Sequence, residues 1–365
     1  MRNRIALSAL LVVIAALALG AAACGGTTPS DGATSGSPVA KEATGPLNLL
    51  LWEGYASDEL VKGFQDQYPG VKVNVAYIGS NDEVFAKIRT KSNQYDLIPA
   101  TTDVSMQYID AGLVQPIDLA NITNYSAMFP TFQNLAQAEK DGVVYGVAHT
   151  WSADPILYNA DVVKNPEQSY KILWDEQYSG KISMYDDIGS LWVGAIVDGY
   201  PPFTLQGAEM DAVVKTMEDQ KPLIRKYWST GNDLVNLFES GEVTVATGWN
   251  YMYTQLKADG MNVGRISPSE GNLGWVDTLL VPLNAKNPYT AQLWIDWAIS
   301  GKGGSYTAKA SGYSISNPAI NEFLTPEEIT DLHMDDPAFI DKIILWQPVD
   351  RPVYQDAWNQ VKAAQ

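Results

Sequence analysis

The sequence predicts an α/β protein in which helices cover a largely parallel sheet. Apolar strands and amphipathic helices alternate along the chain, and this order of elements places helices over parallel strands. Residues 47–365 also form a segment of more than 300 residues with abundant Trp, Tyr and Val. At that length a single hydrophobic core usually divides. We therefore expect an α/β protein with two lobes.

The first strand–helix–strand unit lies directly after the N-terminal region. Residues 47–52 form a short apolar strand, and Ser57 can cap the helix that follows because its hydroxyl can accept a hydrogen bond from the first turn. Pro69 and Gly70 end this helix. Residues 71–77 then alternate between apolar and polar, as expected of a second strand.

The same order of elements returns twice in the second half of the chain. We expect Asn232 or Asp233 to cap a helix that ends at Gly241 and leads into another strand. Further on, a helix containing Trp297 is expected to end at Gly301. Residues 301–304 superficially resemble a phosphate-binding loop, but the required upstream Gly and the following Ser or Thr are missing.

Ligands of open α/β sheets bind beyond the carboxyl ends of the strands. In this sequence those places combine an aromatic or hydroxyl side chain with, in most cases, a carboxylate. Asp186 and Asp187 would point opposite ways in a strand, so at most one of them faces a site. The strand ends concerned are residues 52–55, 101–103, 186–187, 249–250 and 275–277.

The N-terminus has the pattern of an export signal. Arg2 and Arg4 precede an uncharged, mostly apolar run that closes on small residues at 20–23, directly before Cys24. The pattern resembles a bacterial lipobox, although Ala21 stands where a branched apolar residue is usual. We expect a signal peptide at 1–23 and lipidation of Cys24. An ordinary secreted protein and an uncleaved membrane anchor are the alternatives.

Composition indicates an extracytoplasmic protein that a lipid anchors to the cell membrane. Residues 24–46 are mostly Gly, Thr, Ser, Ala and Pro, which predicts a flexible tether. Cys24 is the only cysteine, so the exported domain has no disulfide. The formal net charge is −18, and it becomes −20 when two arginines leave with the signal. This charge argues against nucleic acid and suits a cationic ligand, although solubility alone explains it equally well.

The sequence offers little support for catalysis, and we expect no enzyme activity, no cofactor and no metal. There are two histidines and no cysteine in the exported domain, which excludes thiol nucleophiles and cysteine-type zinc sites. We interpret His149 as a crossover or pocket-wall residue and His333 as part of an exposed acidic turn. Pairs of carboxylates leave a secreted carbohydrate-active enzyme as an alternative.

The side chains at the strand ends suit an aliphatic amine. Its methylene groups need flat apolar walls, and its ammonium groups need carboxylates and aromatic faces. The candidate walls are Trp52, Tyr55, Trp249, Trp275 and Tyr313. The candidate carboxylates are Glu53, Asp103, Asp187 and Asp277.

From about residue 47 to 365, the chain resembles the spermidine/putrescine-binding proteins of polyamine ABC importers. Short matching segments occur in the same order and at similar spacing. They are residues 51–55, 95–98, 101–103, 112–115, 117–118, 144–147, 151, 173–174, 178–181, 186–187, 248–250, 274–277, 284–287, 312–313 and 346–347.

The resemblance implies the two-lobed periplasmic-binding-protein fold of type II, with the ligand cleft between lobes that crossover strands join. Lobe 1 would contain residues 47–151 and 276–320, and lobe 2 would contain residues 152–275 and 321–365. The expected ligand is a small cationic polyamine, and the expected partner is the permease of an ABC transporter. The binding protein itself would be a monomer. A protein of the same fold for a sugar, an amino acid or ferric iron remains an alternative, as does a purely structural surface lipoprotein.

The resemblance also implies the ligand-binding residues. Three departures from the family pattern leave the choice between spermidine, putrescine and another amine open: Glu53 is shifted by one position, Ser190 replaces a common Glu, and Asp103 stands where some members have Tyr. The ligand-binding set is Trp52, Glu53, Tyr55, Thr101, Asp103, Asp187, Trp249, Trp275, Asp277, Tyr313 and Gln347.

Overall fold

The computed structural model describes residues 42–90 and 94–364. The predicted signal peptide, Cys24 and most of the predicted tether lie outside the described residues. Residues 41–365 group into one compact unit. Within the described part of the chain, no helix combines the length and the apolar character needed to cross a membrane.

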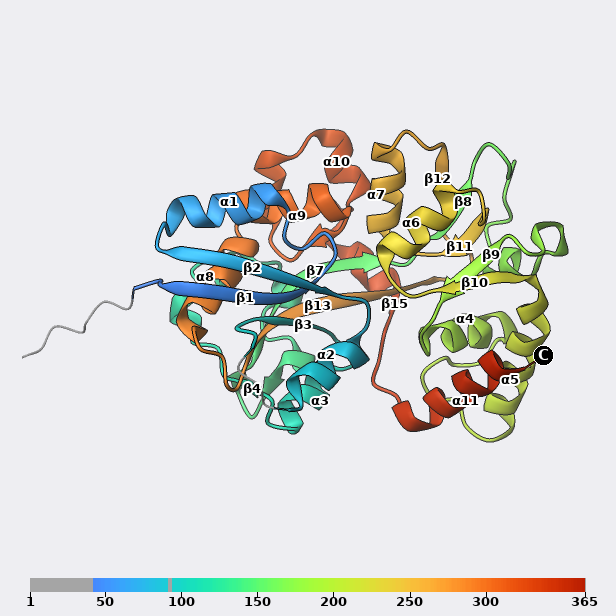
Figure 1. Cartoon of the computed structure of the whole chain (residues 1–365), viewed down its shortest axis with the longest axis horizontal. Helices are drawn as coiled ribbons and strands as arrows, with labels where there is room; N and C mark the ends of the chain where they lie inside the picture. Colours follow the sequence, from blue (N-terminus) through green and yellow to red (C-terminus); the bar gives the residue numbers. More distant parts are fainter. Residues whose placement is uncertain (1–41, 91–93, 365) are drawn as a thin grey trace, which may run out of the picture. The chain divides into compact units, whose positions relative to one another are not determined.

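The first lobe begins with a parallel pair of strands. β1 (Gly45–Trp52) pairs with β2 (Val71–Ile78) in parallel, and α1 (Asp58–Gln67) connects them (Figure 1). Ser57 caps α1, because its side chain accepts a hydrogen bond from the backbone N–H of Leu60. The predicted cap is therefore confirmed. Strand β1 begins two residues before the predicted start of this strand at residue 47.

A second sheet of this lobe contains the longest strand, β13 (Asn272–Pro282). It pairs with β7 (Gly146–Ala153), β3 (Ile98–Thr101) and β4 (Val114–Gln115) in antiparallel fashion. The short strands at its edges are β14 (Ser314–Ile315), antiparallel to β7, and β15 (Ile343–Leu345), parallel to β13. The sheets are thus mixed rather than largely parallel, because β7 and β13 run in opposite directions.

The second lobe is built on another mixed sheet, with the strand order β10-β9-β11-β8-β12. Helices cover both of its faces: α6 and α7 lie on one side and α4, α5 and α11 on the other (Figure 1). The strands are β8 (Ile156–Asn159), β9 (Ile182–Tyr185), β10 (Ile224–Trp228), β11 (Val245–Thr247) and β12 (Val263–Ile266). The helices are α4 (Gly189–Asp198), α5 (Ala208–Gln220), α6 (Gly231–Glu239), α7 (Asn250–Ala258) and α11 (Arg351–Ala363).

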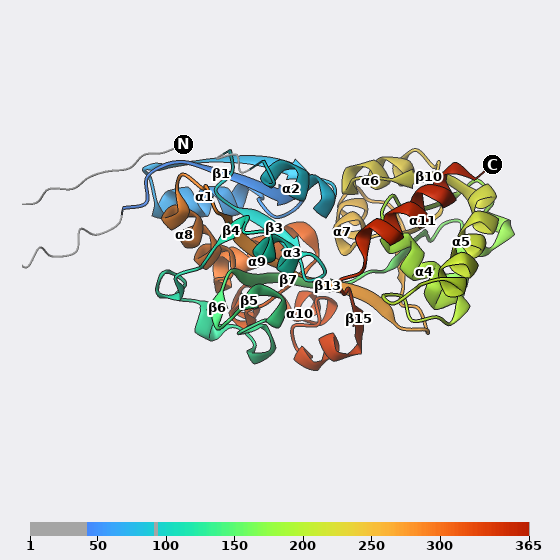
Figure 2. The same ribbon diagram turned by 90° about the horizontal axis from the view of Figure 1, so that it is seen from below.

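The chain passes between the lobes at β7–β8, at β12–β13 and after β15, and Figure 2 shows these segments between the two groups of elements. The prediction of two α/β lobes joined by crossing strands is confirmed. The remaining elements are α2 (Asn81–Ile88), α3 (Ser105–Asp110), α8 (Pro288–Ala298), α9 (Gly301–Ser311), α10 (Pro326–Asp331), β5 (Glu139–Lys140) and β6 (Val143–Val144).

Short 3-10 turns make many of the connections. They are η1 (Leu119–Asn121), η2 (Tyr125–Ala127), η3 (Pro130–Phe132), η4 (Ala136–Ala138), η5 (Tyr170–Trp174), η6 (Glu176–Tyr178), η7 (Lys221–Leu223), η8 (Pro318–Phe323) and η9 (Pro337–Lys342).

Two predicted helix boundaries were wrong. Thr230 caps α6 in place of Asn232 or Asp233, because its hydroxyl accepts the N–H of Asp233. Gly301 was predicted to end the helix that contains Trp297. It is instead the first residue of the next helix, α9, which Ser300 caps. A Cβ on Gly303 would lie 2.0 Å from the carbonyl oxygen of Trp297. This glycine therefore serves the close approach of two consecutive helices.

The segment before β15, which was expected in lobe 2, lies against elements of the first lobe. Residues before β15 pack on the first lobe, where Ile320, Leu332 and Met334 form a buried cluster with Ala308 of α9 and Ile315 of β14. The Ser314 hydroxyl also donates a 2.6 Å hydrogen bond to the carbonyl oxygen of Leu332. Apolar burial against α9 and β14 therefore keeps this segment with the first lobe.

Candidate functional site

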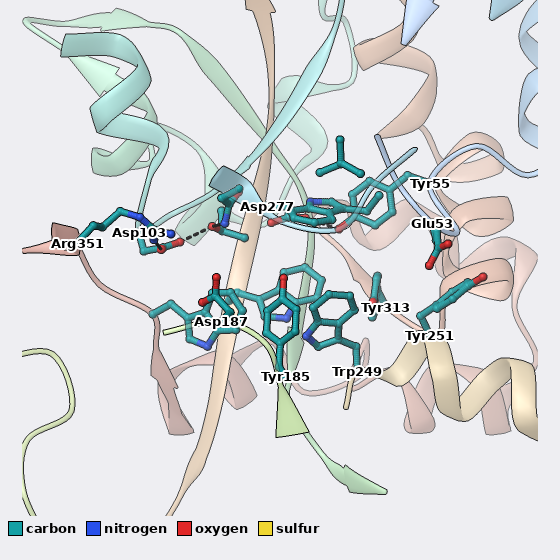
Figure 3. A pocket seen from close by; sticks show the side chains of 16 residues that line it. Glu53, Tyr55, Asp103, Tyr185, Asp187, Trp249, Tyr251, Asp277, Tyr313 and Arg351 are labelled. Carbon is teal, nitrogen blue, oxygen red and sulfur yellow. Dashed lines mark hydrogen bonds and ion pairs between the residues drawn. The ribbon is translucent and has the colours of Figure 1, made fainter. Parts of the chain in front are cut away.

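An open cavity of about 590 Å³ lies between the lobes, where strand ends from both meet (Figure 3). Its walls combine aromatic rings with carboxylates and one guanidinium group. We call it the cleft. The lining residues are Trp52, Glu53, Tyr55, Ile78, Asn81, Thr101, Asp103, Tyr185, Asp187, Trp249, Tyr251, Trp275, Asp277, Tyr313, Trp346 and Arg351.

The structure brings the predicted ligand-binding residues together in the cleft, with one exception. Gln347 is exposed and lines a separate depression beside Phe132 and Ile340. Its neighbour Trp346 lines the cleft, and the Trp346 Nε1–H donates a 3.1 Å hydrogen bond to Oδ2 of the half-buried Asp154. Trp346, and not the predicted Gln347, therefore lines the cleft.

Several cleft residues were missed from the sequence. Tyr185 ends β9, directly before the predicted Asp186 and Asp187, so the strand-end rule could have found it. Arg351 carried no such signal, since it begins a helix more than 160 residues further along the chain. The other missed residues are Ile78, Asn81, Tyr251 and Trp346.

Both histidines lie outside the cleft lining. His149 is buried behind the wall and meets Tyr55 edge-to-face, with the ring centroids 5.1 Å apart. Burial lowers the pKa of His149 to about 3, so its imidazole is neutral at physiological pH. His333 stacks on Phe339 at 3.6 Å. The described residues contain no group of three or more His, Cys, Asp or Glu side chains arranged to hold a metal ion.

Aromatic rings from both lobes meet edge-to-face around the cleft. Trp52 of the first lobe lies 6.1 Å from Trp249 of the second, measured between ring centroids. Trp249 in turn packs 5.1 Å from Tyr185, and Trp275 packs 4.8 Å from Tyr313. Such contacts between rings add to the energy of burial and hold the rings in position. The aromatic rings of the two lobes therefore support one another across the cleft.

Asp277 lies in the middle of the cleft, on β13. Its side chain is buried, and Oδ2 accepts a 2.6 Å hydrogen bond from the hydroxyl of Tyr55. Oδ1 is buried without a hydrogen-bond partner among the described residues. Burial raises the pKa of Asp277 to about 7, although the hydrogen bond from Tyr55 and the nearby indole N–H of Trp52 both act in the opposite direction. The carboxyl group is thus placed to receive a cationic hydrogen-bond donor, which would favour its charged form.

Asp103 and Asp187 lie at one end of the cleft and face Arg351. The Arg351 Nη1 lies 3.4 Å from Asp103 Oδ2, and Asp103 Oδ1 accepts a hydrogen bond from the hydroxyl of Thr101. Burial raises the pKa of Asp103 to about 6, opposed by Thr101 and Arg351. Burial also raises the pKa of Asp187, which Arg351 again opposes. These two carboxylates therefore already have a cationic neighbour.

Glu53 lies at the other end of the cleft and contacts the second lobe. Its Oε1 accepts a 2.6 Å hydrogen bond from the Asn232 side chain, and its Oε2 accepts a 3.1 Å bond from the Asn232 backbone N–H. Tyr251 donates a 3.0 Å hydrogen bond to the Asn232 side-chain oxygen. Both oxygens of Glu53 are thus engaged with α6, so this carboxylate joins the two sides of the cleft.

Other contacts also cross from lobe to lobe. The hydroxyl of Tyr185 donates a 2.6 Å hydrogen bond to the carbonyl oxygen of Gly79. A Cβ at Gly79 would lie 2.7 Å from the carbonyl oxygen of Ser229, so only glycine allows this approach. The two lobes are therefore in direct contact beside the cleft.

Comparisons with known proteins agree with this architecture. The sequence matches the family described as bacterial extracellular solute-binding protein over residues 59–339. The spermidine/putrescine-binding periplasmic protein of Escherichia coli is 26% identical over 324 residues, covering 87% of this chain and 91% of that protein.

Two solved structures share the fold. A lipoprotein of Treponema pallidum is 23% identical with a TM-score of 0.74, covering 87% of this chain and 99% of that one. The periplasmic binding protein MotA of A. tumefaciens, in complex with glucopine, is 16% identical with a TM-score of 0.73, over 87% and 99% of the two chains. The predicted periplasmic-binding-protein fold is confirmed.

Proposed function

We propose that this chain, which belongs to the family of bacterial extracellular solute-binding proteins, captures a polyamine outside the cytoplasm and delivers it to the permease of an ABC transporter. The observation that carries the proposal is the buried Oδ1 of Asp277, which has no partner among the described residues and belongs to a carboxyl group inside an aromatic cleft. The polyamine-binding relative from Escherichia coli supports the same ligand class.

An alkyl amine has two parts, a charged ammonium group and an apolar methylene chain. An ammonium group at Asp277 would donate a charge-assisted hydrogen bond to Oδ1 and would convert a carboxyl of raised pKa into a paired carboxylate. The methylene chain would lie along the aromatic wall formed by Trp52 and Trp249, whose rings come from opposite lobes and meet edge-to-face. Aromatic faces attract an ammonium group as well as apolar carbon. The cleft therefore suits both parts of the ligand.

The two-lobed fold suits capture and release. A ligand that contacts both Trp52 of one lobe and Trp249 of the other would favour the arrangement in which the lobes touch. This arrangement would be the one that the permease recognises. We further propose that lipid on Cys24 holds the protein at the membrane near that permease. The N-terminal sequence pattern supports this anchor, and two or more acyl chains hold a protein far better than one.

A thermal-shift screen with the purified full-length protein tests the ligand class. The compounds are putrescine, cadaverine, spermidine and agmatine, beside γ-aminobutyrate, glucose and ferric citrate. We expect stabilisation by at least one of the four amines, followed by a calorimetric titration that gives one site per chain. A shift with the sugar, the amino acid or the iron complex and with none of the amines would replace the polyamine by that solute. Turnover of a glycoside panel would indicate an enzyme instead.

A further inference from the structure

We infer that Arg351 determines which amines the cleft accepts, because its guanidinium group occupies the end of the cleft formed by Asp103 and Asp187. The cleft would then take a diamine at Asp277 and reject a longer triamine whose additional ammonium group must enter the Arg351 end. This inference rests on the proposed function and adds the length and charge of the ligand to it.

Arg351 is the first residue of α11, so it comes from the second lobe, and its side chain lines the cleft with 16% of its surface exposed. Nη2 donates a 2.8 Å hydrogen bond to Asp82 Oδ1 at the rim, and Nη1 lies 3.4 Å from Asp103 Oδ2. Both acids belong to the first lobe. The guanidinium group therefore reaches across the cleft.

Hydrogen bonds within the first lobe hold Asp103 in place at the Arg351 end of the cleft. The side chain of Asn81 donates a 2.6 Å hydrogen bond to the hydroxyl of Thr101, and that hydroxyl donates to Asp103. Asp103 thus has one oxygen bound to its own lobe and the other directed toward Arg351. A cation at the N-terminus of a helix opposes the helix dipole. Attraction by Asp82, Asp103 and Asp187 must outweigh that cost for Arg351 to be held here.

An entering ligand would meet the positive charge of Arg351. Arginine stays protonated in proteins, so its positive charge cannot be removed by proton loss. An ammonium group placed beside Asp103 or Asp187 would also lie close to this guanidinium, and like charges in a partly desolvated site repel strongly. Asp277 is different, because its Oδ1 is the buried carboxylate oxygen without a partner among the described residues. At one end of the cleft the carboxylates thus already share a guanidinium partner, whereas in the middle Oδ1 of Asp277 has none among the described residues.

The position of Asp277 within the cleft sets the direction in which a bound ligand can extend. Figure 3 shows Asp277 between Arg351 with Asp103 on one side and Glu53 with Tyr251 on the other. An amine bound at Asp277 can extend only away from Arg351, along the aromatic wall toward Tyr251. A diamine satisfies this arrangement with one ammonium group at Asp277 and the other beside the ring of Tyr251, since both oxygens of Glu53 already accept hydrogen bonds from Asn232. A triamine that spans the cleft in both directions does not.

Calorimetric titration of the full-length chain with putrescine and spermidine tests the inference. We expect the wild type to bind putrescine at least about tenfold more tightly than spermidine, a difference of about 1.4 kcal/mol. Arg351→Gln should raise the ratio of spermidine to putrescine affinity by about tenfold or more, because it removes the repelling charge. Arg351→Lys keeps the charge and should leave the ratio near that of the wild type. Arg225→Gln is the surface control, since Arg225 pairs with Glu242 away from the cleft.

Arg351→Met provides a second variant if Arg351→Gln is poorly folded, because it keeps the aliphatic stem and loses the charge. The double variant Arg351→Gln/Asp103→Asn should lose the gain in spermidine affinity, because the vacated end then has one carboxylate fewer. An unchanged affinity ratio in folded Arg351→Gln and Arg351→Met overturns the inference. An equal loss of both amines also overturns it and would limit Arg351 to holding the lobes together. A wild type that binds none of the four amines of the thermal-shift screen would instead refute the proposed function.

Discussion

The indole Nε1 of Trp275 donates a hydrogen bond to Oδ1 of Asp154 over 3.0 Å. Asp154 lies between β7 and β8, and Trp275 lies on β13, so the bond joins two of the segments that connect the lobes. Trp346 follows β15 and donates to the other oxygen of the same carboxyl group at 3.1 Å. The half-buried side chain of Asp154 therefore connects all the crossing segments named above and orients two tryptophans of the cleft.

Asp154→Ala should destabilise the protein by about 2–4 kcal/mol, because it leaves two buried indole N–H groups without acceptors. Asp154→Asn keeps one acceptor oxygen and should cost about 1–2 kcal/mol. Urea unfolding with tryptophan fluorescence measures both variants. Equal stability of Asp154→Ala and the wild type would mean that the two hydrogen bonds do not support the crossing segments.

Asp277→Asn should weaken binding of the preferred amine by more than about tenfold, because an ammonium group in the cleft would lose its charged partner. The variant should remain folded, since the amide oxygen can still accept the hydrogen bond from Tyr55. Asp219→Asn is the matched control on the exposed surface, where Asp219 pairs with Lys215. Calorimetry that finds unchanged affinity would remove Asp277 from the ligand site.

Amine binding should weaken as the pH falls through 7. Burial raises the pKa of Asp277 in the empty cleft to about 7, and a bound ammonium would lower that pKa. Binding below pH 7 must therefore release a proton, and affinity at pH 6 should be about tenfold below that at pH 8.

Titrations in two buffers of different ionisation enthalpy count the released proton. The Asp277→Asn variant is the control, because its remaining dependence belongs to other groups such as Asp103. A wild-type affinity independent of pH between 6 and 8 would contradict the assignment of the ammonium site to Asp277.

The same shift predicts how the stability of the empty protein depends on pH. The pKa of the Asp277 carboxyl is an ordinary 3.8 in the unfolded chain and about 7 in the folded chain. In that window the folded state holds a proton that the unfolded state has lost, so the contribution of Asp277 to stability falls as the pH rises. Ligand-free Asp277→Asn should therefore be more stable than wild type at pH 8, by up to about 4 kcal/mol.

Thermal unfolding of the wild type and Asp277→Asn at pH 4 and pH 8 measures this effect. The advantage of the variant should nearly disappear at pH 4, which lies close to the pKa of 3.8 in the unfolded chain and well below the pKa of about 7 in the folded chain. A variant that melts below the wild type at both pH values would indicate that a charged Asp277 stabilises the empty cleft.

Glu53 and Asn232 should act as a pair in ligand binding, because their hydrogen bonds join the first lobe to α6. We expect Glu53→Ala and Asn232→Ala each to weaken affinity by a few-fold, with a coupling of about 0.5–1.5 kcal/mol in the double variant. Calorimetry of the four proteins in this cycle provides the measurement. Additive effects would mean that Glu53 contacts the amine directly, as the sequence predicted.

Position along the chain was enough to predict much of the site. Trp52 ends β1 and Trp249 follows β11, while Asp277 and Trp275 lie on the long strand that joins the lobes. Strand ends of an α/β protein gather at one edge of the sheet, so residue types at those ends indicate the chemistry of the cleft. Ser57 likewise follows from local rules, because the donors that it satisfies lie within the next turn. The N-terminal pattern ending at Cys24 is also local.

Tertiary structure alone decided which carboxylates are free to bind a ligand. Glu53 is engaged by Asn232 and Asp103 faces Arg351, although these partners are separated by 179 and 248 positions in the sequence. Gln347 turns outward because its neighbour Trp346 is bound to Asp154. The charge and hydrogen bonding of a buried group depend on its neighbours in space. The sequence therefore determined the kind of site, and the packing of distant segments determined that Asp277 is its open carboxylate.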